Sequence, residues 1–194
     1  MKTNLIALFS VGVALLFTQP TMAQQSASNA MMKSMQSGMS QMMSMKMTSD
    51  PDHDFATMMR MHHQGAVEMA DLELKQGKDA PTKALASRIK AANQREIKEM
   101  TQFLGSHKPV ASSMAKMGKS GMKMMDSGKH SMNGKTDHDF ASVMAQHHQQ
   151  AVDMSRAFLK EGKTAKMKAL ANSIIREQTK EIAELKKLET SLKG

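Results

Sequence analysis

Hydrophobic positions recur every three or four residues along four stretches of this chain, which is the spacing of helices that bury one face. We predict helices over residues 51–76 and 80–104, a third from Thr136 up to Gly162, and a fourth that begins at Thr164. The stripe that should face inward on the first helix consists of Phe55, Met59, His62, Ala66, Met69 and Glu73. A glycine follows each of the first three stretches, where helices commonly end.

Two of these helix starts carry capping signals. Pro51 suits a first turn because its missing N–H is not needed there, and Asp50 or Ser49 precedes it as the cap. Thr136 is predicted to cap the third helix, with Asp139 completing a Thr-x-x-Asp capping box. Both signals support the helix starts independently of the hydrophobic pattern.

The four predicted helices form two copies of one unit. At 25 of the 49 positions from 52 to 100, the residue 85 positions later is identical. A repeat of this length is a duplicated structural unit rather than a short motif. Two duplicated helical hairpins pack best as a four-helix bundle with a pseudo-two-fold axis. We therefore predict an all-α fold, in which the long linker between the repeats leaves the helix order around the bundle open.

The start of the chain has the pattern of a secretory signal peptide. Lys2 supplies the positive start, an apolar core runs from Leu5 to Phe17, and small residues precede a predicted cleavage after Ala23. The apolar run is shorter than a comfortable membrane span, although a retained N-terminal anchor is the alternative. We predict export, and no stable membrane insertion once the signal is removed.

Changes in composition divide the chain into segments. The predicted segments are a signal peptide (1–23), a methionine-rich flexible segment (24–49) and a four-helix domain (50–194). Within that domain we expect repeat 1 (50–105), a methionine-rich flexible linker (106–135) and repeat 2 (136–192). Each repeat is thus preceded by its own methionine-rich segment.

Composition adds two constraints. The chain has no cysteine, so disulfides and thiolate metal ligands are excluded. It has 24 methionines, of which 8 lie in residues 31–47 and 6 in residues 114–132. Helical spacing would permit a marginal amphipathic helix in the first of these segments, although Gly38 and several serines weaken it. The methionines with this spacing are Met32, Met35, Met39 and Met42.

The net charge of +9 raises the question of an anionic partner. The lysines, however, are spread along the helices among glutamates, and the chain has no Trp or Tyr to stack on bases. We therefore interpret the charge as belonging to a solvated surface, and we predict no nucleic-acid partner.

The repeated His-His pairs carry the strongest chemical signal. Neighbouring helical residues point about 100° apart, so His62 and His63 cannot readily hold one ion together. Thioether and imidazole groups on one helical face, present in both halves, indicate a soft metal such as Cu(I) or Ag(I), with Cu(II) as the alternative oxidation state of copper. The candidate metal ligands are Met59, His62, His63, Met69, Met144, His147, His148 and Met154.

A buried histidine that is simply hydrogen-bonded is the alternative interpretation. The turn of each hairpin places Asn93 or Gln178 opposite the histidines, where an amide would satisfy a core imidazole or support a metal-bound one. Glu96 and Glu181 also recur, and we interpret them as ordinary solvated helix positions. Methionine packs adaptably in cores, so the flexible segments supply only weaker candidates. The weaker metal candidates are His53, His138, Met32, Met35, Met39, Met42, Met43, Met122, Met124 and Met125.

Signals for catalysis are weak. A di-iron carboxylate bundle would need Glu-x-x-His on two helices, and this spacing does not occur, which counts against a metal-dependent oxidase. The sequence has no glycine-rich phosphate loop and no setting for a serine nucleophile. We therefore predict no enzyme, and we keep a non-metal interaction or chaperone-like module with methionine-rich surfaces as the alternative function.

The pattern Asp-x-x-Phe, Met, His-His, Ala-x-x-Met resembles the CopM-like copper-binding family, also known as domain of unknown function 305. The residues that match are Asp52, Phe55, Met59, His62, His63, Ala66 and Met69, and again Asp137, Phe140, Met144, His147, His148, Ala151 and Met154. The resemblance covers about residues 50–190. It implies a ferritin-like four-helix bundle in the periplasm of a Gram-negative bacterium, with Cu(I) and Ag(I) bound by methionine and histidine. A role in metal sequestration, tolerance or delivery follows, with periplasmic copper transport or efflux components as expected partners.

Overall fold

The computed structural model describes residues 22–110 and 131–193, and every regular element in these ranges is a helix. The helices are α1 (Met22–Ser44), α2 (Pro51–Gln76), α3 (Ala80–Ser106), α5 (Thr136–Leu159) and α6 (Ala165–Ser191). Four of them match the helices predicted from the two repeats, which confirms the all-α bundle. The predicted signal peptide lies almost entirely outside the described residues, as does much of the predicted linker.

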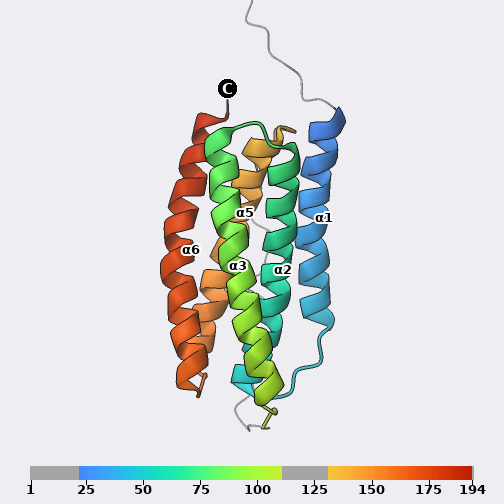
Figure 1. Cartoon of the computed structure of the whole chain (residues 1–194). Coiled ribbons are helices and arrows are strands. Elements are labelled where there is room, and N and C mark those ends of the chain that lie inside the picture. Colours follow the sequence, from blue (N-terminus) through green and yellow to red (C-terminus); the bar gives the residue numbers. More distant parts are fainter. Residues whose placement is uncertain (1–21, 111–130, 194) are drawn as a thin grey trace, which may run out of the picture.

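The helices are arranged in three layers (Figure 1). In the middle layer α2 contacts α5, while α3 pairs with α2 and α6 pairs with α5 on one side. On the other side α1 packs against both α2 and α5, and so adds a fifth helix that the repeat does not predict. None of the helices in the described ranges is long and apolar enough to cross a membrane.

The helix starts agree with the predicted capping signals at α2 but not at α5. Asp50 caps α2 by accepting hydrogen bonds from backbone amides of the first turn, and Thr164 caps α6 in the same way. The capping box predicted for α5 is wrong, because Thr136 is already its first residue and Lys135 precedes it without a side-chain cap. The Asp139 carboxylate instead accepts hydrogen bonds of 2.8 and 2.9 Å from two backbone amides of the preceding loop.

We predicted a flexible methionine-rich segment at residues 24–49, but the structure has most of this segment in the docked helix α1. Met31, Met35 and Met42 are buried against the rest of the bundle. The Ser28 hydroxyl donates a 2.6 Å hydrogen bond to the Asp139 carboxylate of α5. Most helical stability in proteins comes from burying an apolar face. Packing on α2 and α5 therefore outweighs the poor helix propensity of the glycine and serines in α1.

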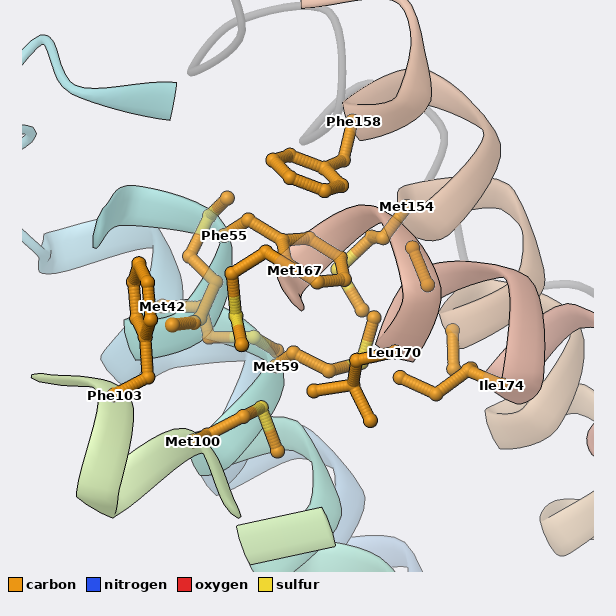
Figure 2. Packing of buried hydrophobic residues seen from close by; sticks show 14 residues of the cluster. Met42, Phe55, Met59, Met100, Phe103, Met154, Phe158, Met167, Leu170 and Ile174 are labelled. Carbon is orange, nitrogen blue, oxygen red and sulfur yellow. The ribbon is translucent and has the colours of Figure 1, made fainter. Parts of the chain in front are cut away.

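The apolar interior of the bundle contains two clusters. In the first, the rings of Phe55 and Phe158 stack with their centroids 4.1 Å apart. Figure 2 shows how side chains from all five helices converge there, and its labelled members include Met42, Met59, Met100, Met154 and Met167. The second cluster is built around Phe140, Leu85 and Ile89. All six residues predicted to face inward on α2 are buried, which confirms the predicted stripe.

Two aspartates join the repeats reciprocally. Asp52, at the start of α2, accepts hydrogen bonds of 2.8 and 2.9 Å from two backbone amides of the loop between α5 and α6. Asp137, at the start of α5, accepts bonds of 2.8 and 2.7 Å from two backbone amides of the loop between α2 and α3. Each carboxylate therefore closes the loop of the other repeat. This exchange fixes the register of α2 against α5, and so decides which residues meet between them.

Candidate metal centre

The two His-His pairs meet between α2 and α5, in the middle layer of the bundle. The rings of His62 and His147 stack, with their centroids 3.6 Å apart and their planes inclined by 30°. The rings of His63 and His148 each lie 6.3 Å, between centroids, from the neighbouring histidine on the same helix. None of the four residues is more than 3% exposed. The fold thus gathers four buried imidazoles from positions 85 residues apart in the sequence.

Carboxylates from α3 and α6 hold one histidine in each repeat. His63 Nε2 lies 2.6 Å from Glu96 Oε2, with hydrogen-bond geometry. His148 Nε2 lies 2.9 Å from Glu181 Oε2, an ion-pair contact whose angles do not make a hydrogen bond. Our interpretation of these two glutamates as solvated positions is wrong, because their side chains are only 15% and 16% exposed and reach the histidines.

In the part of the chain that the structure describes, the two amides predicted to face the histidines make no hydrogen bond to them. Asn93 donates its side-chain N–H to a backbone carbonyl one turn earlier, at 2.9 Å. The side-chain oxygens of Asn93 and Gln178 are buried and have no hydrogen-bond partner. A different amide takes the predicted role, since Gln150 Oε1 lies 3.4 Å from His62 Nε2. Gln150 follows the second His-His pair by two residues, and the pattern of apolar positions gave no reason to select it.

One of the positions near the histidines at which the two repeats differ affects the packing of α1. The counterpart of Gln150 in α2 is Gly65. A Cβ atom at Gly65 would lie 3.4 Å from His147 Nε2 and 3.8 Å from the backbone oxygen of Ser34 in α1. The missing side chain therefore lets α1 approach closely, and α1 covers the histidines on this side.

Each of the four imidazoles has a buried Nδ1 atom without a hydrogen-bond partner. For His63, the contact with Glu96 places the ring proton on Nε2, because an ionised carboxylate accepts and cannot donate. The lone pair on Nδ1 then stays available to a ligand. Metal-binding histidines recurrently present their other nitrogen to a carboxylate, which fixes the tautomer and strengthens the ligand.

Burial keeps the central pair of histidines uncharged. The pKa of His62 is lowered to about 3, first by burial and then by the charge of His63, against the opposing contact with Gln150. The pKa of His147 is lowered well below its usual value, first by burial and then by the charge of His62. A neutral imidazole binds a metal ion without first losing a proton, so metal binding at this pair would be insensitive to pH near neutrality.

The four candidate methionines lie in the two apolar clusters, and all four are buried. Met59 and Met154 belong to the cluster shown in Figure 2. Met69 and Met144 belong to the second cluster. Each cluster therefore contains one candidate methionine from each repeat. The two candidates of one repeat are thus separated, and each lies in a cluster with a candidate of the other repeat.

The weaker candidates come from the first turns of α2 and α5, from α1 and from the linker, and two of them, Met35 and Met42, share the apolar clusters of the main methionine candidates. His53 and His138 occupy the first turns of α2 and α5, and His138 Nδ1 lies 3.0 Å from its neighbour Asp139. In α1, Met35 and Met42 are buried, Met32 and Met39 are partly buried, and Met43 is 62% exposed. The linker candidates Met122, Met124 and Met125 lie outside the described residues.

The donor atoms define which ions suit this centre. No three His, Cys, Asp or Glu side chains within residues 22–110 and 131–193 are arranged to hold a metal ion. An ion between α2 and α5 would therefore need thioether sulfur among its ligands, or a shift of the imidazoles. Buried imidazole nitrogen combined with thioether sulfur fits a soft monovalent ion better than Zn²⁺ or Mg²⁺.

These features define a class of protein, an all-α bundle of two helical hairpins with histidines and methionines at its centre. The family model described as "Domain of unknown function (DUF305)" matches residues 52–189. The chain belongs to this family, as the Asp-x-x-Phe and His-His pattern predicts. The helix α1 precedes the matched region. Among curated proteins, none matches the sequence significantly.

Solved structures of the same family share the fold. CopM in an Ag-bound form prepared by soaking matches with a TM-score of 0.58 and 29% sequence identity, over 74% of this chain and 97% of that chain. CopM in the Cu(I)-bound form matches with a TM-score of 0.57 and 30% identity, over 74% and 98% of the two chains. A DUF305 fragment from Deinococcus radiodurans has a TM-score of 0.56 and 21% identity, over 73% and 97%, and supports the fold alone.

Proposed function

We propose that the protein binds Cu(I), and Ag(I) as its chemical analogue, at the histidines and methionines between α2 and α5. The observation that carries this proposal is the group of four buried imidazoles whose Nδ1 atoms have no partner, with buried thioethers in the clusters on either side. The resemblance to CopM, which was solved with silver and with Cu(I) bound, supports the choice of ion.

The donor set suits storage or transfer of the ion rather than catalysis. Thioethers are neutral, have no proton to lose and are not consumed by disulfide formation, so they remain ligands in an oxidising compartment. Export to the periplasm, which the N-terminal pattern predicts, is consistent with this chemistry. We propose a role in copper sequestration, tolerance or delivery, with periplasmic copper transport or efflux components supplying or receiving the ion.

Competition between the protein and a colorimetric Cu(I) chelator tests the proposed donor atoms. The double variant Met59→Leu with Met154→Leu removes two sulfurs while keeping side-chain volume, so the fold should survive. We expect Cu(I) affinity to fall at least roughly tenfold, the scale of effect seen when a supporting partner of a metal ligand is lost. Unchanged affinity in this variant would remove the thioethers from the proposed site.

The histidines need a separate pair of variants with a matched control. The variant His63→Gln with His148→Gln should lose tight Cu(I) binding, because each loses an imidazole held by a glutamate. The control is His107→Gln. His107 lies outside the centre, at the end of α3, where its side chain contacts Asp50. Circular dichroism verifies that all variants keep their helices. If the double variant binds Cu(I) as tightly as the control, the central histidines are not the ligands.

The alternative of a non-metal interaction module has less support. It depends on exposed methionine-rich surfaces, and the N-terminal segment instead buries Met31, Met35 and Met42 within the protein itself. Among the large hydrophobic side chains of α1, only Met22 and Met43 remain exposed. The methionines of this segment therefore act first as packing residues.

A further inference from the structure

A cleft of about 450 Å³ opens between α3 and α6, on the side of the middle layer opposite α1. The polar side chains that line it and matter here are Asn93, Glu96, Glu99, Glu177, Gln178 and Glu181. Two pairs among them, at positions 93 and 178 and at positions 96 and 181, are equivalent in the two repeats. Both repeats therefore contribute equivalent residues to the cleft, as they do to the group of four histidines.

The charge of this cleft is opposite to that of the whole protein. Four carboxylates line it, and Arg95 is the single basic side chain among its lining residues. The chain as a whole carries a net charge of +9. A cleft in which charges of one sign predominate concentrates ions of the opposite sign and speeds their association, and the carboxylates predominate here even though Glu177 pairs with Arg176 at 3.1 Å. Cations that approach this basic protein are thus drawn towards the α3–α6 cleft.

Two buried amides in its wall distinguish this cleft from a solvated acidic surface. Asn93 and Gln178 line it and are only 1% and 3% exposed. Asn93 Oδ1 and Gln178 Oε1 have no hydrogen-bond partner. Leaving a buried carbonyl oxygen without a partner is unfavourable, and a cation or its bound water entering the cleft would satisfy it. The wall therefore offers oxygen acceptors that the protein itself does not use.

Two glutamates connect the cleft with the buried histidines. Glu96 and Glu181 line the cleft and also touch His63 and His148, at 2.6 and 2.9 Å. On the opposite side of the middle layer, α1 covers the histidines where it approaches Gly65. On the cleft side of the middle layer, these two glutamates therefore form a polar connection between the cleft and the imidazoles.

We propose that the α3–α6 cleft is the entrance through which a copper cation reaches the buried histidines, with Glu96 and Glu181 passing it from the cleft to His63 and His148. This inference rests on the proposed function. The transfer exchanges carboxylate and water oxygen for the softer imidazole nitrogen and thioether sulfur that Cu(I) prefers, and it changes no oxidation state. Imidazole nitrogen and thioether sulfur suit Cu(I) better than carboxylate oxygen does, so this proposal assigns the cleft as the passage and the histidine centre as the resting site.

The rate of Cu(I) uptake tests the entrance separately from the affinity of the centre. Cu(I) is supplied without oxygen as its weak acetonitrile complex, and binding is followed by stopped-flow ultraviolet absorbance. The variant Glu99→Gln with Glu177→Gln removes two charges from the cleft without touching a histidine. We expect its uptake rate to be roughly three- to tenfold lower at low ionic strength, and the difference to disappear at high salt. Ala169→Phe, which narrows the cleft, should slow uptake at every ionic strength.

The control variant Glu68→Gln with Glu189→Gln makes the same charge change outside the cleft, and should take up Cu(I) at the parent rate. The amount of Cu(I) bound at the end of each trace reports on the histidine centre independently of the rate. Equal uptake rates in the cleft variants and the control would refute the proposal that the cleft is the entrance. A parent protein that takes up no Cu(I) at all would overturn the proposed function itself.

Discussion

Replacing Glu73 with glutamine should stabilise the protein at neutral pH, because the native side chain is a carboxyl group buried in the bundle. Glu73 is 0% exposed, and its counterpart in the second repeat is Phe158. The pKa of Glu73 is raised to about 9, first by burial and then by the charge of Asp137, while Lys83 opposes the shift. Neither carboxyl oxygen makes a hydrogen bond of good geometry, although Asp137 lies close, so burial is the main cause.

The size of the effect follows from the two pKa values of Glu73. The unfolded chain ionises this carboxyl above its ordinary pKa of 4.5, whereas the folded protein keeps it protonated up to about 9. Each pH unit between these values costs the folded state about 1.4 kcal/mol, which amounts to about 3 kcal/mol at pH 7. The stabilising contribution is complete below the unfolded pKa and is lost as the pH rises towards the folded one. Glutamine cannot ionise, so the variant should gain about 3 kcal/mol over the parent at pH 7.

Urea unfolding followed by far-ultraviolet circular dichroism measures this difference. The useful quantity is the unfolding free energy of Glu73→Gln minus that of the parent, because other groups titrate equally in both proteins. The difference should be small in acid and grow steadily towards alkaline pH. The control Glu68→Gln changes an exposed residue on the same helix. Its unfolding free energy should vary with pH in the same way as that of the parent. A difference between Glu73→Gln and the parent that stays constant with pH would refute the buried, protonated carboxyl.

Three further outcomes follow from the same contacts. The pKa values of His62 and His147 are lowered in the fold, so the melting temperature should fall as the pH drops below their ordinary value of 6.5, with a weaker fall in the variant His62→Gln. Asp52→Asn or Asp137→Asn should each lower the unfolding free energy by roughly 2 kcal/mol in urea titrations, because each removes the charge from the bonds that close the opposite loop. Gly65→Gln should displace α1 without unfolding the hairpins, and limited proteolysis that cuts α1 no faster than in the parent would contradict the close approach.

The helices of the two repeats were predictable because their signals are local. Pro51 and Thr164 mark helix starts in the sequence itself, and the apolar stripes follow helical periodicity. The N-terminal helix was not predictable in the same way. Its methionine spacing favours a face through Met32, Met35, Met39 and Met42, whereas the docked helix buries Met31, Met35 and Met42 most fully. Which methionines of α1 are buried depends on the surfaces of α2 and α5, and these surfaces cannot be deduced from the sequence of the segment itself.

The candidate centre was predictable in its ligand types but not in its geometry. The duplicated His-His pairs could be singled out because repetition preserved them beside methionines. The stacking of His62 on His147 depends on how α2 lies against α5, and the linker left that arrangement open. Glu96 and Glu181 resemble solvated residues because lysines are frequent around them. Their inward reach depends on the register of each hairpin, which the turn determines only approximately.

The exchange of Asp52 and Asp137 between the hairpins bears on how such a chain came about. Each hairpin leaves two loop amides that an aspartate of the other hairpin satisfies. A single hairpin is therefore structurally incomplete, but two identical copies would complete each other by the same contacts. The duplicated chain is consistent with descent from a homodimer whose subunits became joined by gene fusion. The two copies are not interchangeable, because the position of Gln150 in α5 is taken by Gly65 in α2, and the helix α1 packs beside that glycine.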